Sequence, residues 1–383
     1  LGCCRFKSGK SLMDRETLKY WLALNMVVGV GRTLFHRLVQ GFGSPREVFS
    51  AAREDLQRIQ GVGRKVVDEI KRFDVDLAAE RELRLADNEG LRVLTLESPE
   101  YSPLLKSIYD PPPILYIKGK ALNTIALPLA VVGTRTPSEY GKLVAERLCL
   151  KLASAGFSII SGLARGIDTL AHKAALTAGA DTIAVFGCGL GHTYPPENLN
   201  LRKQIVEQGA ILSEFPVLMR PDRNNFPARN RILSGLALGT VVVEAAEKSG
   251  ALITADFALE QGREVFAIPG NITSPKSKGT NNLIKSGAKL VDSPESILEE
   301  LLPALGESLK AQAEIEKPKI LLDNDEEKKI FSLLSLEGRH IDNLIENSNL
   351  SPAQVSATLL QLELRGVVRQ LSGKMYISNC SDE

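Results

Sequence analysis

Short apolar runs alternate with amphipathic stretches between residues 127 and 303, and this alternation constrains the fold more than any other feature of the chain. The runs have the length of β-strands, and the stretches between them space apolar residues as a helix does; Val144, Leu148 and Leu152 share one helical face. The pattern predicts an α/β fold with a doubly wound, parallel, Rossmann-like sheet. The seven expected strands are residues 129–132, 157–160, 182–186, 210–213, 240–244, 264–268 and 288–291.

The segment before this region has a helical pattern that is interrupted twice by a similar phrase, VVGVGR at 27–32 and IQGVGR at 59–64. This repetition predicts an N-terminal helix-hairpin-helix domain at 13–74. In such a hairpin, glycines permit the tight turn, and the backbone N–H groups that begin the second helix can face a phosphate. Residues 13–72 carry eleven Lys/Arg against seven Asp/Glu, so this weak positive charge also fits a hairpin that only packs helices.

The segment after the sheet turns polar at 304–324, which indicates a linker. Three helical patterns and a hairpin at Ser372-Gly373 then predict a winged-helix domain at 325–379, with Ser351 as an N-cap and Pro352 at the first helical position. We expect the Rossmann-like domain to extend over residues 75–303. Its first part, residues 75–126, contains apolar phrases that indicate an added strand layer or a lead-in to the sheet. Residues 1–12 are an extension without an assigned role.

Composition narrows the classes of function. Forty-seven basic residues against 46 acidic ones leave a net charge of +1, so a nucleic-acid site must be a local patch. The five cysteines lack zinc-type spacing, and their odd number favours reduced thiols in a cytoplasmic protein. The apolar runs are shorter than the roughly 18 residues of a membrane span, so we expect a soluble protein. We also expect that it requires neither a metal nor a cofactor.

Three loops that follow expected strands carry residues suited to anions. Ligands of an open parallel sheet bind outside the carboxyl ends of its strands, where glycine exposes the backbone and a helix N-terminus attracts negative charge. Glycine at such turns can equally be required by the backbone geometry of the turn without any ligand. The G-x-G-x-x-G fingerprint is absent from the first turn, which disfavours dinucleotide binding. In SGLARGID we expect the first two residues to open a helix. The candidate DNA-binding residues here are Gly133, Thr134, Arg135, Ser161, Gly162, Arg165 and Gly187.

The richest segment for nucleic-acid binding is residues 213–235, where arginines and amides surround an aromatic residue before a helix. Arginines can neutralise phosphates, and Phe226 can stack on a base, as single-stranded sites require. The alternative is that Phe226 belongs to the core and that Asn230 or Arg231 ties the helix to the sheet, and for Arg231 we favour this structural role. The further DNA-binding candidates are Arg223, Asn224, Asn225, Phe226, Arg229 and Asn230, and Arg220 lies beside them.

Several phrases resemble the DNA-processing protein A (DprA/Smf) family in order and spacing: VVGTRTPSEYG, SGLARGIDTLAH, FPARNRILSGL and GTNNLIKSGA. The resemblance spans residues 75–303, and the flanking parts resemble that family's SAM-like and winged-helix domains. It implies single-stranded DNA binding, a homodimer formed through the Rossmann-like domain, and loading of the RecA recombinase in natural transformation. It also implies that Arg135, Arg223 and the backbone of Gly133, Ser161 and Gly162 hold phosphates and that Phe226 contacts a base.

Two other classes of function compete with this hypothesis. A nucleotide phosphoribohydrolase would use a glutamate near a strand end, as Glu244 is, but the PGGxGTxxE phrase of those enzymes is missing and His172 is expected to be structural. A winged-helix regulator would need a basic recognition helix, whereas Arg365 is the sole basic residue there and residues 325–383 carry six Lys/Arg against nine Asp/Glu. We therefore expect a DNA-binding protein that is not an enzyme.

Overall fold

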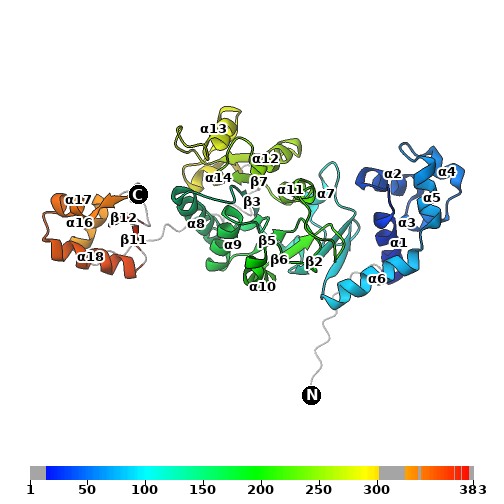
Figure 1. The fold of residues 1–383 in the computed structure, drawn as a ribbon, viewed down its shortest axis with the longest axis horizontal. Coiled ribbons are helices and arrows are strands. Elements are labelled where there is room, and N and C mark those ends of the chain that lie inside the picture. Colours follow the sequence, from blue (N-terminus) through cyan, green and yellow to red (C-terminus); the bar gives the residue numbers. More distant parts are fainter. Residues whose placement is uncertain (1–13, 302–323, 335–337, 366, 372, 379–383) are drawn as a thin grey trace, which may run out of the picture. The chain divides into compact units, whose positions relative to one another are not determined.

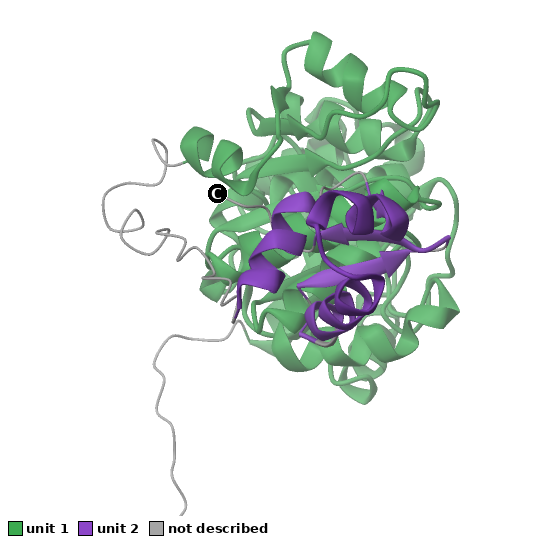
Figure 2. Ribbon diagram, turned by 90° about the vertical axis from the view of Figure 1, so that its left-hand side faces the viewer, with its two compact units in different colours: residues 1–315 green, residues 316–383 purple. Residues whose placement is uncertain are grey.

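The computed structural model describes residues 14–301, 324–334, 338–365, 367–371 and 373–378. Its contacts divide the chain into two compact units, residues 1–315 and 316–383, which Figure 2 distinguishes by colour. The expected extension at 1–12 lies outside the described residues, and so does the expected linker at 304–324 except for its last residue.

A nine-stranded sheet forms the centre of the first unit, in the order β1-β2-β6-β5-β4-β3-β7-β8-β9 (Figure 1). All seven strands expected between 127 and 303 are present, and neighbours among them pair in parallel. The prediction of a doubly wound sheet is therefore confirmed for this region. These strands are β3 (Pro128–Val132), β4 (Ser158–Ser161), β5 (Thr182–Val185), β6 (Ala210–Ser213), β7 (Gly239–Val242), β8 (Glu264–Ala267) and β9 (Lys289–Leu290).

The segment before residue 127 adds two strands that pair antiparallel, so the sheet as a whole is mixed. β1 (Arg92–Thr95) and β2 (Ile114–Gly119) form an antiparallel pair, and β2 also pairs antiparallel with β6. Consecutive antiparallel strands need no crossover helix, and the connection between β1 and β2 contains only the short helix α7 (Pro103–Lys106). Residues 92–119 are thus a lead-in that extends the edge of the same sheet, and not a second layer.

Both faces of the sheet are covered, because successive residues of β3 enter different cores. Leu129 and Val131 pack with α8, α9 and α14, whereas Ala130 and Val132 pack with α11 and α12. This explains why the strands appear in the sequence as uninterrupted apolar runs. The covering helices are α8 (Glu139–Ser154), α9 (Ile167–Thr177), α14 (Pro294–Leu301), α11 (Asn225–Gly235) and α12 (Gly250–Glu260). The chain also forms α10 (Leu199–Gln208) and α13 (Lys278–Lys285).

The N-terminal helices contain the two expected hairpins. Gly29 and Gly61 have φ of +88° and +93°, values that favour glycine, so each phrase makes the same turn between two helices. Trp21 and Phe35 of these helices share one hydrophobic core with Phe186 at the end of β5. The helices are α1 (Arg15–Met26), α2 (Arg32–Phe42), α3 (Pro45–Ser50), α4 (Arg53–Arg58), α5 (Arg64–Arg72) and α6 (Val75–Asn88). The proposed 74/75 boundary falls before α6, which packs on α1 through ion pairs of Arg15.

The second unit is the expected winged helix. Three helices enclose a core that includes Ile330, Leu344 and Leu359, and the strands pair in the order β10-β12-β11. Ser351 caps the third helix, as the sequence predicts, and the structure adds a capping box with Gln354. The elements are α16 (Asp325–Leu333), β10 (Arg339–His340), α17 (Ile341–Ser348), α18 (Pro352–Leu364), β11 (Val368–Leu371) and β12 (Met375–Ser378).

Membrane-spanning helices are not found in the part of the chain that the structure describes, where each helix is too short or too polar to cross a bilayer.

Candidate nucleic-acid interface

The loops that follow β3, β4 and β5 meet the first turn of α11 at the carboxyl edge of the sheet. They enclose a shallow pocket of about 20 Å³. A cavity needs roughly 10–15 Å³ to hold a water molecule, so a nucleobase can lie on this pocket but cannot enter it. The lining residues are Arg135, Gly162, Ala164, Arg165, Tyr194, Pro195, Phe226 and Arg229.

A cation and two aromatic rings form the surface of this pocket. The guanidinium carbon of Arg135 lies 5.6 Å from the centroid of the Phe226 ring, and the centroid of the Tyr194 ring lies 5.7 Å from the same centroid. Phe226 is half-buried and Tyr194 is 38% exposed, so both rings reach solvent. Tyr194 was missed by the sequence analysis, although the phrase TYPPEN after the third strand offered an aromatic residue in a strand-end loop.

The loop after β3 holds Arg135 at the surface by fixing the backbone on either side of it. Gly133 packs so closely on Ile167 that a Cβ would lie 2.6 Å from that side chain. The backbone N–H of Thr134 donates to the carbonyl of Glu244 at 2.7 Å, and the N–H of Ser138 donates to the Glu244 carboxylate at 2.8 Å. Arg135 itself is exposed, and its charge is available to an anion.

The loop after β4 differs from the prediction. α9 begins at Ile167, five residues beyond Gly162, so Ser161 and Gly162 do not open a helix. The Ser161 hydroxyl is buried and donates to the Val131 carbonyl at 2.7 Å, and the Gly162 N–H donates to the Asp168 carboxylate at 3.1 Å. An internal carboxylate therefore occupies the backbone group that was expected to hold a phosphate.

Arg165 and Arg229 have opposite environments around this loop. Arg165 is exposed and pairs with Glu197. Arg229 is 4% exposed and lies beneath Gly162, where a Cβ would overlap its guanidinium, and its Nη1 donates to the Val185 carbonyl at 2.7 Å. Burial lowers the pKa of Arg229 to about 10, so it stays charged at neutral pH. Arg229 is thus a buried charge below the loop and not a surface arginine.

The remaining candidate DNA-binding residues also separate into exposed residues and residues whose side chains are hydrogen-bonded within the protein. Arg223 and Asn224 are exposed just before α11. The Asn225 amide contacts the Met219 sulfur at 3.6 Å, and the Asn230 amide donates to the Gly250 carbonyl at 3.2 Å. Asn230 therefore has a structural contact, but it ties α11 to the start of α12 and not to the sheet as the alternative supposed.

Gly187 and Arg231 support the site without forming its surface. A Cβ on Gly187 would lie 2.7 Å from the Phe226 ring, so this glycine lets the ring pack against the loop after β5. Arg231 is 2% exposed, pairs with Glu214, and donates to the Asp110 carbonyl at 2.7 Å. The structural role that the sequence favoured for Arg231 is confirmed.

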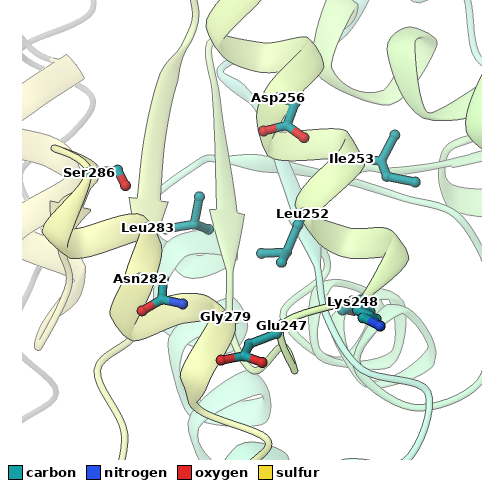
Figure 3. A pocket seen from close by; sticks show the side chains of 10 residues that line it. Glu247, Lys248, Leu252, Ile253, Asp256, Gly279, Asn282, Leu283 and Ser286 are labelled. Atoms are coloured by element: carbon teal, nitrogen blue, oxygen red, sulfur yellow. The ribbon is translucent and has the colours of Figure 1, made fainter.

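A larger pocket of about 430 Å³ lies between α12 and α13. Leu252 and Leu283 point toward one another across it, and Glu247, Lys248 and Asp256 lie around them (Figure 3). Among the described residues that line it there is neither an arginine nor an aromatic side chain, so this pocket lacks the groups that bind a single strand.

Family models match three parts of the chain. The model described as DNA recombination-mediator protein A matches residues 92–302, more than half of the sequence. A SAM-like helix-hairpin-helix tandem matches 22–73, and a DprA winged helix domain matches 314–374.

Two curated relatives agree with these matches. Protein Smf from Synechocystis sp. is 36% identical over 395 aligned residues, which cover 95% of this chain and 99% of that protein. DNA processing protein DprA from Bacillus subtilis is 46% identical over 226 residues, or 59% of this chain and 74% of that protein.

Two solved structures are also similar. DNA processing protein A from Streptococcus pneumoniae has a TM-score of 0.65 and 34% identity, covering 76% of this chain and 99% of that chain. DNA processing protein A from Helicobacter pylori, described for its single-stranded DNA binding mode, has a TM-score of 0.50 and 32% identity, covering 56% of this chain and 97% of that chain.

Proposed function

Because this chain belongs to the DNA recombination-mediator protein A (DprA/Smf) family, we propose that it binds single-stranded DNA across the loops after β3, β4 and β5. One observation carries the proposal: an exposed guanidinium, that of Arg135, lies over Phe226 beside a second exposed ring. Stacking needs a free base face and phosphates need a cation, and a single strand offers both at every nucleotide. The single-stranded DNA binding mode described for the Helicobacter pylori protein supports this assignment.

Within this proposal, the exposed residues meet the DNA and the buried ones hold the loops. Arg135, Arg165 and Arg223 contact phosphates, Phe226 and Tyr194 stack on bases, and the backbone of Gly133 and Thr134 keeps Arg135 in place. Asn224 and Asn225 border the track. Four residues beneath the surface shape the site through their packing and contacts: Gly162, Gly187, Arg229 and Asn230. Ser161 fixes the end of β4 through its hydrogen bond to Val131.

We further propose that the protein is not an enzyme, that it acts in the cytoplasm as a homodimer, and that it protects single strands and loads RecA onto them in natural transformation. Family membership supports these finer statements. In a homodimer, two linked sites would raise the avidity for longer strands.

Neither competing function gains support. The Glu244 carboxylate, which a phosphoribohydrolase would use, is 3% exposed and accepts the Ser138 N–H. In the winged helix, both Glu327 oxygens accept hydrogen bonds from Arg365, the basic residue that a recognition helix would offer. The acidic balance of that domain also disfavours binding of duplex phosphates.

Binding to single-stranded and duplex oligonucleotides over a series of salt concentrations tests the proposal. We expect tight binding of single strands with a log–log slope of about −2 to −4, since each phosphate contact contributes roughly −0.7, and far weaker binding of blunt duplex. Equal affinity for both forms would refute a site that selects single strands over duplex.

Phe226→Ala is expected to weaken single-strand binding by about 1–3 kcal/mol without changing the salt slope, because stacking releases no counterions. Arg135→Ala should instead flatten the slope by about one contact. Since the two side chains touch, the double variant should lose less than the sum of the single losses, with a coupling of about 0.5–2 kcal/mol. Fluorescence anisotropy measures all three. A Phe226→Ala effect confined to the melting temperature would assign the ring to the core.

A further inference from the structure

The two hairpins have the same local structure. In each, a G-V-G phrase ends in an arginine that begins the next helix, Arg32 in α2 and Arg64 in α5. The N-caps Gly31 and Gly63 provide no side-chain cap, so both helix starts present free backbone N–H groups and the positive end of a helix dipole. Any difference in their roles must come from what surrounds them.

Their surroundings are opposite. Nη1 of Arg32 lies 3.2 Å from the Glu214 carboxylate, and its Nε lies 3.4 Å from the Asp110 carboxylate. Arg64 is exposed and forms no ion pair with any residue that the structure describes. The Arg32 side chain at the start of α2 thus already pairs with two carboxylates, and a phosphate bound to this side chain would meet like charge.

The carboxylate that Arg32 contacts begins the segment that leads to the proposed DNA site. Glu214 follows β6 directly and also pairs with Arg231 of α11. Exposed Arg220 and Arg223 follow in the same segment, which ends at the N-cap of α11.

The N-terminal helices hold this segment at a second point. Glu82 of α6 is 6% exposed, and its carboxylate accepts the backbone N–H of Val217 at 2.7 Å. Val217 in turn accepts the N–H of Gly191, in the loop after β5, at 2.8 Å. His36 of α2 makes a separate hydrogen bond to the Pro111 carbonyl at 2.9 Å, in the connection between β1 and β2 and outside this segment.

We infer that the first hairpin is a docking element, and that Arg32 and Glu82 are positioning residues that hold residues 214–224 in the conformation in which the single-stranded site is complete. The inference rests on the function proposed above. A single strand binds the competent conformation of this segment, so loosening it raises the apparent Kd in proportion to the competent fraction that is lost. A positioning residue releases no counterion and leaves the salt slope unchanged.

The matched arginines provide the test. In the full chain, Arg32→Ala should raise amide hydrogen exchange of residues 214–224 several-fold and weaken binding of a fluorescent oligothymidylate about five-fold at an unchanged salt slope. Arg64→Ala should leave exchange in that segment as it is in the wild type. Glu82→Gln keeps an acceptor for the Val217 N–H and should stay near the wild type, whereas Glu82→Ala should behave as Arg32→Ala does.

Two outcomes would overturn the inference: unchanged exchange of residues 214–224 in both Arg32→Ala and Glu82→Ala, or a salt slope in Arg32→Ala that flattens by one contact. If Arg32→Ala does not fold, the two Glu82 variants still test the inference, because they change the contact of Glu82 with the Val217 N–H separately. If the wild type does not bind oligothymidylate, the proposed function fails, and the exchange comparison made without DNA still decides whether the hairpin positions the segment.

Discussion

Arg231→Ala is expected to lower the free energy of unfolding of the first unit by about 3–5 kcal/mol. The Arg231 side chain is 2% exposed, so its removal leaves a cavity beside α11. The removal also deprives the Glu214 carboxylate of its buried ion-pair partner. Urea denaturation followed by the fluorescence of Trp21 measures this change, because Trp21 is the chain's one tryptophan and is buried in that unit.

Two control variants separate charge from volume and from surface effects. Arg231→Met keeps most of the buried side-chain volume, so this variant should recover part of the lost free energy of unfolding. Arg223→Ala, at an exposed position of the same segment, should change the unfolding free energy by less than about 0.5 kcal/mol while flattening the salt slope of DNA binding. If Arg231→Ala were as stable as Arg223→Ala, Arg231 would have no structural role.

These arginines show what sequence reasoning could not resolve. Arg220, Arg223, Arg229 and Arg231 occur within twelve residues and look alike as a basic run, yet two are exposed and two are buried. The difference comes from α11, which turns Arg229 beneath Gly162 and Arg231 toward Glu214. Burial of a charge depends on partners from distant strands, and local composition does not contain them.

The strands, by contrast, could be predicted because their burial is local in origin. Each is short and lies between helices on both faces, so nearly every residue of it must be apolar. The parallel order followed from the regular alternation with helices. β1 and β2 depart from this alternation, and only the pairing of β2 with β6 and of β1 with β2 shows that they extend the same sheet.

The loop after β4 was misread for a specific physical reason. Serine and glycine before an apolar run commonly begin a helix, so Ser161-Gly162 matched that signal. The chain instead continues to Gly166, which is the N-cap of α9 at a φ of +75°, and the Asp168 carboxylate accepts the N–H of Gly162. An aspartate in the first turn of a helix was the signal that a carboxylate already occupied this site.

His172, in contrast, was expected to be structural, and its contacts agree. The Thr182 hydroxyl donates to the Ile159 carbonyl at 2.7 Å, so it accepts from Nδ1–H of His172, also at 2.7 Å. Nε2 has no partner among the described residues and is buried. Burial, assisted by the charge of Arg229, lowers the pKa of His172 from 6.5 to about 3. The folded protein therefore holds this imidazole neutral.

This lowered pKa predicts a loss of stability in acid. Above pH 6.5 His172 is neutral in both states, and below it only the unfolded chain takes up the proton, so the folded state is disfavoured as the pH falls toward 3. Each unit below the unfolded pKa costs about 1.4 kcal/mol, which amounts to about 3 kcal/mol at pH 4. Unfolding in urea at a series of pH values, followed by Trp21 fluorescence, measures this dependence.

His172→Leu isolates the contribution of this histidine, since the other groups of the chain titrate alike in both proteins. The variant should lose about 1 kcal/mol near pH 8 with the hydrogen bond to Thr182, and its stability should fall less steeply than that of the wild type between pH 6.5 and 4. The two curves should therefore cross, with the variant the more stable protein at pH 4. Parallel curves over this range would mean that His172 titrates alike in the folded and unfolded states, and its burial against Thr182 would then contribute nothing to the acid sensitivity of the fold.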